Sequence, residues 1–191
     1  LTVRDVFEAP TVRALAARGA AATESALTPV TVVDPRPESV PLSFAQLRMW
    51  LINQFDPDLP AYNLPLVADL AGEVDTVALR QAMVDVVARH EVLRTIYPAV
   101  DGVPVQQIAP TTAAEDLDWA QVGPAELEAA LVEGFDVAQQ WPVRVRVAEI
   151  EPGLDRDSGS RRLAVVFHHI AADGESMTPL VRRKPELIKA S

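Results

Sequence analysis

The sequence predicts an α/β fold, a two-layer sandwich in which helices cover a mixed β-sheet. Apolar residues recur at helical spacing in three segments, residues 42–55, 76–90 and 125–135. Short runs of β-type residues alternate with these helices, at residues 66–70, 105–108, 143–149 and 163–167. This alternation is typical of a sheet covered by helices, and 191 residues with 49% apolar content are enough to build its core.

The composition excludes several classes of function. A formal net charge of −10 disfavours nucleic acid and anionic membranes as partners. The absence of cysteine excludes disulfides, thiolate nucleophiles and cysteine-based zinc sites, and it fits a cytoplasmic protein. No apolar run approaches the roughly 18 residues that a membrane-spanning helix needs. We therefore expect a cytoplasmic protein with no nucleic-acid or membrane partner.

The two ends of the chain differ from its middle. Thr11 is a candidate cap for a short helix, residues 12–18, with Gly19 as its stop. Residues 21–39 are small, polar and proline-containing, a composition typical of a linker. The only two lysines, Lys184 and Lys189, fall in the last eight residues, so we interpret residues 184–191 as a non-native tail.

The first two helices of the main segment have clear start signals. Ser43 and Gln46 form a capping-box pattern at the start of residues 42–55. Gly72 breaks the strand at residues 66–70, and Asp75 is a candidate cap for the helix at residues 76–90.

A charged cluster follows the second of these helices. Arg94 lies within a β-type run, where an arginine is costly unless it is paired. Either Arg89 or Arg94 is a candidate partner for Asp173, while packing at the helix end is the default interpretation for His90. Asp101-Gly102 then signals a hairpin.

The second half of the segment reads less uniformly, and residues 110–123 carry no clear pattern. Pro124 precedes the helix at residues 125–135, as proline often does. Residues 143–149 alternate with period two, which predicts a half-solvated strand with Arg144 and Arg146 on one face. A solvated edge explains these two arginines better than an anion site. Residues 151–161 have the composition of a polar loop.

The strand at residues 163–167 leads into two adjacent histidines, His168 and His169. Neighbouring side chains on a strand face opposite ways, so we expect one histidine to be the reagent and the other to pack in the structure. Asp173 and Gly174 follow, before a predicted helix. A metal site is disfavoured because the third histidine is distant in sequence. The sequence also lacks a serine-hydrolase elbow, a phosphate loop and a dinucleotide fingerprint.

Three motifs in the chain resemble those of the condensation domains of nonribosomal peptide synthetases, which have the chloramphenicol-acetyltransferase-like fold. Residues 168–174 match the pattern His-His-x-x-x-Asp-Gly. Leu-Ser-Phe-Ala-Gln-Leu-Arg-Met-Trp, residues 42–50, resembles the first motif of that family. Residues 89–95 resemble its second motif, Arg-His-Glu-x-Leu-Arg-Thr, at every fixed position.

A fourth segment, residues 5–16, resembles the last turn and helix of a peptidyl carrier domain. The resemblances imply four parts: the end of a carrier domain at 1–20, a linker at 21–39, the N-terminal lobe of a condensation domain at 40–183, and the tail at 184–191. A full domain of this family is about twice as long and has its channel between two lobes. We therefore expect this chain to fold as one lobe and to condense poorly or not at all alone.

The resemblance also assigns roles to the histidine motif. It implies that His169 faces the reaction channel, either as general base or by positioning the attacking amine, and that His168 turns into the structure. It implies that Asp173 holds the loop, paired with Arg89. Gly174 permits close approach of the backbone to a substrate, and its N–H, at a predicted helix start, is a candidate donor to an oxyanion. Glu175 stands where many members of the family have an aromatic residue.

The same resemblance predicts the partners of the chain. We expect no cofactor or metal bound by the chain itself, because the substrates would arrive on the phosphopantetheine arms of donor and acceptor peptidyl carrier domains. Neighbouring synthetase domains are further expected partners. Two alternatives stay open. One is an epimerisation domain or a CoA-dependent acyltransferase of the same fold, and the other is a non-catalytic module that docks carriers.

Overall fold

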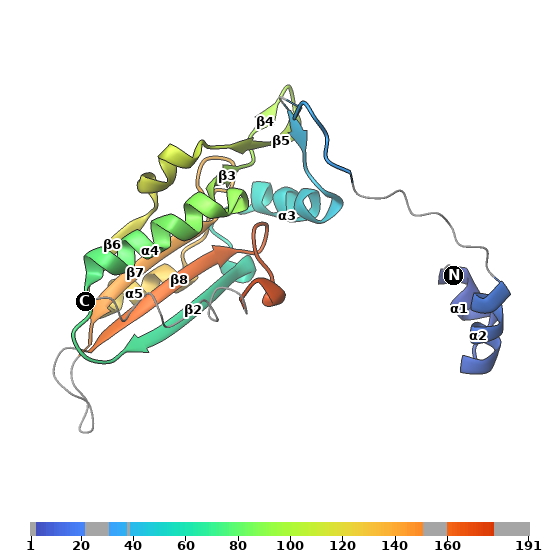
Figure 1. The fold of residues 1–191 in the computed structure, drawn as a ribbon, viewed down its shortest axis with the longest axis horizontal. Helices are drawn as coiled ribbons and strands as arrows, with labels where there is room; N and C mark the ends of the chain where they lie inside the picture. The colour runs from blue at the N-terminus through green and yellow to red at the C-terminus, as the bar shows by residue number, and fades with distance from the viewer. Residues whose placement is uncertain (1–2, 22–30, 38, 151–159, 178–191) are drawn as a thin grey trace. The chain divides into compact units, whose positions relative to one another are not determined.

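The computed structural model describes residues 3–21, 31–37, 39–150 and 160–177 (Figure 1). The chain forms two compact units, Leu1–Pro37 and Glu38–Ser191. The boundary between them falls two residues before the predicted end of the linker. Most of the predicted loop at residues 151–161, the tail at 184–191 and residues 22–30 of the linker lie outside the described residues.

The first unit contains two helices, α1 (Val3–Glu8) and α2 (Val12–Ala21). The hydroxyl of Thr11 accepts a hydrogen bond from the Ala14 N–H at 3.3 Å, as expected of a cap. The predicted stop at Gly19 is wrong, because α2 continues through it; a glycine inside a helix costs only about 1 kcal/mol relative to alanine. Arg18 joins the helices through Glu8, at 2.8 Å. The carrier-domain origin of this unit stays a prediction.

The second unit is built on a four-stranded mixed sheet, in the order β2 (Asn63–Leu70), β8 (Arg161–His168), β7 (Val143–Glu149) and β6 (Trp119–Val122). Strand β8 is antiparallel to both of its neighbours, whereas β6 is parallel to β7. The α/β class and the mixed sheet are therefore confirmed. The predicted histidine strand is the second strand of this sheet, so its end is held on both sides.

Helices cover both faces of this sheet. Alternate residues of β7 and β8, among them Val145 and Phe167, pack in one cluster with Val87 of α4 (Thr76–Arg89), which runs along the sheet in Figure 1. On the other face, Ala164 packs with Leu127 of α5 (Pro124–Val132). The alternation of β8 places His168 on the α5 side.

A second, smaller sheet is built from strands that come before and after α3 (Phe44–Phe55) in the chain. It joins the short strands β1 (Val40–Pro41), β3 (Thr95–Ile96) and β4 (Ala99–Val100) to β5 (Val103–Ile108). Asp101 and Gly102 have φ of 51° and 80°, the two positive values that a tight hairpin turn requires, so the predicted hairpin is confirmed.

Several predicted elements need correction. Arg94 closes the 3₁₀ helix η2 (Glu91–Arg94), so the strand that was expected to contain it begins only at Thr95. The unassigned segment 110–123 forms η3 (Thr111–Asp116) and β6, and α5 ends at Val132. A further 3₁₀ helix, η1 (Pro60–Tyr62), leads into β2.

The prediction that residues 143–149 form a half-solvated strand is wrong. Strand β7 lies inside the sheet between β8 and β6, and the residue Arg144 is only 2% exposed. Valines of β7 pack on the side of α4. Arg144, on the opposite face of the strand, is buried beneath the end of α5, where it is hydrogen-bonded.

Candidate active site

The histidine motif lies where β8 leaves the sheet. The strand ends at His168, a turn follows at residues 169–171, and residues 174–177 are helical. The His168 N–H donates to the carbonyl of Pro142 at 3.0 Å, and the His169 N–H donates to that of Tyr62 at 2.8 Å. The backbone is thus held by the residues that immediately precede both neighbouring strands, at the point where the two side chains separate.

His168 is buried, as predicted for the histidine that turns into the structure. It is 1% exposed, and its ring lies edge-on to Phe135 with the centroids 6.1 Å apart. Its Nδ1 accepts a hydrogen bond from the Ile170 N–H at 3.1 Å, which places the proton of the neutral ring on Nε2. Burial, with a smaller contribution from neighbouring His169, lowers the pKa of His168 to about 4. His168 is therefore neutral near pH 7.

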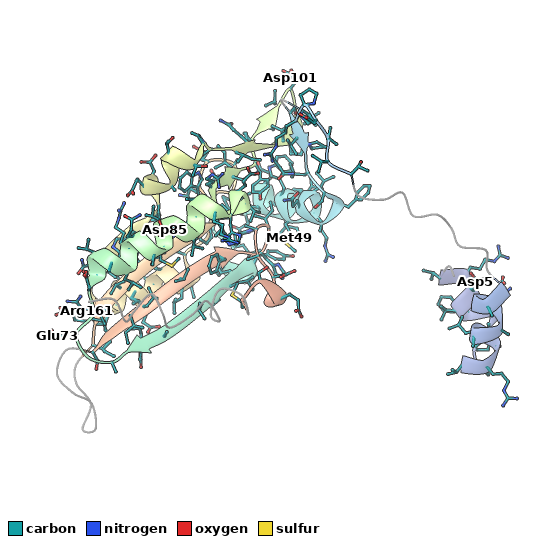
Figure 2. The ribbon with its side chains drawn as sticks, in the orientation of Figure 1. Asp5, Met49, Glu73, Asp85, Asp101 and Arg161 are labelled. Atoms are coloured by element: carbon teal, nitrogen blue, oxygen red, sulfur yellow. The ribbon has the colours of Figure 1, made fainter. Side chains whose placement is uncertain are left out.

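His169 is half-buried and lines a cavity of about 480 Å³, a size typical of small-molecule sites. The opposite wall comes from the first turns of α3, where Figure 2 labels Met49. The remaining lining residues are Ser43, Ala45, Gln46, Ile170, Ala171, Ala172, Asp173 and Ser176. The cavity thus combines two of the motifs noted in the sequence, which lie more than 100 residues apart.

The position of α3 against the cavity is fixed at its N-terminus and near its middle. The Ser43 hydroxyl accepts from the Gln46 N–H at 3.2 Å while the Gln46 side chain accepts from the Ser43 N–H at 2.9 Å, which confirms the predicted capping box. Further along the helix, the Trp50 indole donates to the carbonyl of Tyr97 at 2.7 Å. The wall that faces His169 is therefore a capped and anchored helix.

Asp173 holds the local turn. Its carboxylate accepts hydrogen bonds from the Ser176 N–H at 2.9 Å and from the Ser176 hydroxyl at 2.7 Å, and its own N–H donates back to that hydroxyl at 3.2 Å. The bonds from Ser176 keep the pKa of Asp173 below its ordinary value. This geometry supports the loop-holding role that the resemblance implied.

The expected arginine–aspartate bridge is not formed within the described residues. Arg89 is exposed on α4, and Arg94 is 5% exposed and donates to the carbonyls of Val87, at 3.1 Å, and Ala88, at 2.9 Å. These carbonyls belong to the last turn of α4, which has no partners within the helix. Arg94 therefore caps α4, and Asp173 is satisfied by its own turn.

Among the described residues, nothing restricts the position of Gly174 to glycine. Its φ is not positive, and a Cβ added to it would meet no heavy atom of the described residues within 4 Å. The proposed use of its N–H towards an oxyanion stays a prediction. Glu175 next to it is exposed.

Sequence reasoning missed the polar residues behind the motif. Asn53, Asn63 and Arg144 bond the segment that follows α5, which supports His168 from beneath. An arginine between valines of a strand was visible in the sequence, but its acceptors are backbone carbonyls of another element, which no local pattern marks.

Two absences concern the described residues only. They contain no group of three or more His, Cys, Asp or Glu side chains placed to hold a metal ion. No helix in the described ranges combines the length and the apolar character needed to cross a membrane.

Comparison with known proteins identifies the family of the chain. The family model described as "Condensation domain" matches residues 37–185. A probable non-canonical nonribosomal peptide synthetase, CymA of Salinispora arenicola, is 40% identical over 185 residues, which is 94% of this chain and 2% of that protein. The isonitrile lipopeptide synthase of Mycobacterium tuberculosis is 41% identical over 160 residues, or 78% of this chain and 6% of that protein.

Solved structures give the same picture. The X-domain from teicoplanin biosynthesis is 32% identical with a TM-score of 0.63, over 78% of this chain and 32% of that one. The starter condensation domain of rhizomide synthetase, at 20% identity, shares the fold, with a TM-score of 0.62 over 77% of this chain and 36% of that one. This chain thus spans about a third of the structures that it matches. It belongs to the condensation-domain family of nonribosomal peptide synthetases.

Proposed function

We propose that this chain supplies the histidine-bearing side of a site that forms a peptide bond between a donor acyl thioester and the amine of an acceptor aminoacyl thioester. Each substrate is carried on the phosphopantetheine arm of a peptidyl carrier domain. One observation carries the proposal: His169 faces a cavity of about 480 Å³ walled by α3, while its neighbour His168 is buried and neutral.

The reaction needs proton transfer and charge stabilisation. The acceptor nitrogen attacks the thioester carbonyl carbon, the carbon–sulfur bond breaks, and the pantetheine thiol leaves with a proton in exchange for the one that the amine loses. An imidazole near the attacking nitrogen suits this transfer, which is worth about 10²–10⁴-fold where it operates. His169 is the only histidine among the cavity-lining residues, and it acts either as the base or by orienting the amine.

The cavity needs a second wall to exclude water. Since the chain covers 32% and 36% of two of the matched structures, we propose that this wall comes from the further length of such a domain. The chain alone is then expected to bind substrate weakly and to condense poorly. Its partners are the donor and acceptor carrier domains and the neighbouring domains of a synthetase.

The test is amide formation from donor and acceptor aminoacyl-pantetheine thioesters, followed by mass spectrometry. We compare the 191-residue chain with the full product of the parent gene, each as wild type, His169→Ala and His90→Ala. His90 is the matched control, since it is a histidine outside the cavity. Product from the full protein and its His90→Ala variant, with a loss of at least 100-fold in His169→Ala, supports the proposal. Equal rates in the two variants contradict it.

A second candidate function is a docking module without catalysis. It is favoured by the 31% identity to the X-domain in a structure described as a complex with OxyB, against 20% identity to the starter condensation domain. Binding of a carrier or of a tailoring enzyme, undiminished in His169→Ala and without any amide product from the full protein, would favour docking. Product from CoA thioesters or inversion of the donor would instead indicate the acyltransferase or epimerisation alternative.

A further inference from the structure

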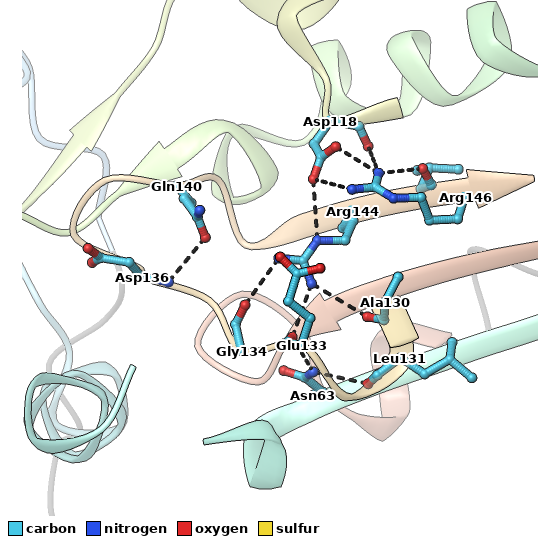
Figure 3. Close-up of polar contacts among 11 residues, drawn as sticks. Asn63, Asp118, Ala130, Leu131, Glu133, Gly134, Asp136, Gln140, Arg144 and Arg146 are labelled. Atoms are coloured by element: carbon cyan, nitrogen blue, oxygen red, sulfur yellow. Dashed lines mark hydrogen bonds and ion pairs between the residues drawn. The ribbon is translucent and has the colours of Figure 1, made fainter. Parts of the chain in front are cut away.

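The segment after α5, residues 133–137, is bonded by side chains from three separate elements. The Asn53 amide of α3 donates to the carbonyl of Phe135 at 2.7 Å and accepts from the Val137 N–H at 3.3 Å. The Asn63 amide, at the start of β2, donates to the carbonyl of Glu133 at 2.9 Å (Figure 3). This irregular backbone is therefore fixed from the helix that walls the cavity and from the strand that pairs with β8.

The contacts that hold residues 133–137 are called the clamp below, and Arg144 of β7 supplies several of them. Its side chain, 3% exposed, donates to the carbonyls of Glu133 at 3.0 Å and Gly134 at 3.1 Å, and it pairs with the carboxylates of Asp118 and Glu133, each at 3.3 Å (Figure 3). It also donates to the Ala130 carbonyl at 3.4 Å, in the last turn of α5. A planar guanidinium serves all of these acceptors at once, which a lysine ammonium does not.

The same guanidinium stacks on an aromatic ring that leads to the histidine motif. Its central carbon lies 4.4 Å from the centroid of the Phe135 ring, within the range of a cation–π contact. Phe135 is 1% exposed, and its ring meets His168 edge-on at 6.1 Å. Arg144, Phe135 and His168 thus form a buried column beneath the turn that carries His169.

His168 links this column to the cavity. Its Nδ1 accepts from the Ile170 N–H across the turn, so the orientation of the buried ring sets the backbone on either side of His169. We infer that Arg144 and Phe135 are positioning residues, which fix the His168 ring and thereby the direction in which His169 enters the cavity. The catalytic consequence rests on the proposed function, but the positioning itself does not.

Arg146 offers a matched control on the same strand. It is also an arginine on the α5 side of β7, and it binds Asp118 at 2.7 and 3.1 Å (Figure 3). None of its hydrogen bonds or ion pairs within the described residues involves the 133–137 segment. Arg144→Lys and Arg146→Lys therefore both keep the charge and weaken contact with Asp118, but only the first removes the clamp on Phe135.

The test uses the three histidines of the chain, whose ring nitrogens give separate signals in ¹⁵N-histidine-labelled protein. We expect Arg144→Lys and Phe135→Leu to shift the ring signals of both His168 and His169, while those of His90 stay in place and Arg146→Lys moves none. Phe135→Leu keeps the side chain apolar and decides the matter if Arg144→Lys does not fold. A folded Arg144→Lys or Phe135→Leu variant with unchanged His168 and His169 signals overturns the inference.

Activity adds a readout that a purely structural role would not give. In the full product of the parent gene, Arg144→Lys is expected to lower kcat at least tenfold with KM within twofold, while Arg146→Lys retains wild-type values. Unchanged kcat in Arg144→Lys contradicts the catalytic part of the inference. If the wild type forms no amide, the proposed function fails, whereas the histidine signals still decide the positioning.

Discussion

The burial of His168 predicts a loss of stability in mildly acidic solution. Its pKa falls from an ordinary 6.5 to about 4 in the folded chain, chiefly because burial disfavours the charged ring. Between these values the unfolded chain binds more protons than the folded one, so stability decreases as pH decreases. From pH 6.5 to 4.5 the free energy of unfolding should fall by about 2 kcal/mol.

The pKa shift of His168 spans this window. The pKa of Asp173 is also lowered in the fold, by its bonds with Ser176, but that contribution is lost only as pH falls through the range below its ordinary value of 3.8. A loss of about 2 kcal/mol is a large share of the 5–15 kcal/mol typical of a domain, so equilibrium unfolding can resolve it.

The assay is urea unfolding at several pH values between 7 and 4.5, followed by tryptophan fluorescence. His168→Asn removes the titrating ring and keeps an oxygen that can accept from the Ile170 N–H. This variant should be less stable at pH 7 because Phe135 loses its packing partner, yet its stability should be nearly independent of pH in the window. A drop of undiminished size in His168→Asn would refute the reasoning.

Two further predictions concern the scaffold. Arg94→Met should lower the free energy of unfolding in urea by about 3 kcal/mol, because the carbonyls of the last turn of α4 lose their buried donor. Arg89→Met, at an exposed position, should lower it by less than about 0.5 kcal/mol. Equal losses in the two variants would favour the ion pair between Arg89 and Asp173 that the sequence predicted. Gly134→Ala should cost about 3 kcal/mol because its Cβ would overlap backbone atoms of residues 57–58, whereas a Cβ at Gly123 meets nothing within 4 Å among the described residues, so Gly123→Ala should cost under about 1 kcal/mol. Similar thermal unfolding of these two variants would contradict the packing at residue 134.

The sequence predicted best those elements whose signals are local. Helix α3 carries its own capping box in Ser43 and Gln46, and Asp75 accepts from the N–H groups of Val77 and Ala78 at the start of α4. The hairpin at Asp101-Gly102 likewise depends on two adjacent residues that tolerate positive φ. These features arise within a few residues, so a pattern along the chain is enough to find them.

The errors arise where distant segments supply the partners. Arg144 alternates with valines as on a half-solvated strand, but a helix end and the carboxylates of Asp118 and Glu133 surround it in the fold. Strand β6 was missed because four residues give too short a pattern and its pairing with β7 is parallel and non-local. The histidine motif was visible in the sequence, whereas its support by Phe135 depends on a segment about 30 residues earlier.

The most direct test of the central claim is the rate of amide formation in a single turnover, with both aminoacyl thioesters loaded on their carriers and the full product of the parent gene. The account predicts that His169→Ala slows this step at least 100-fold, while His90→Ala leaves it within twofold of the wild type. A His169→Ala protein that forms the amide at the wild-type rate would contradict the assignment of His169 to the reaction.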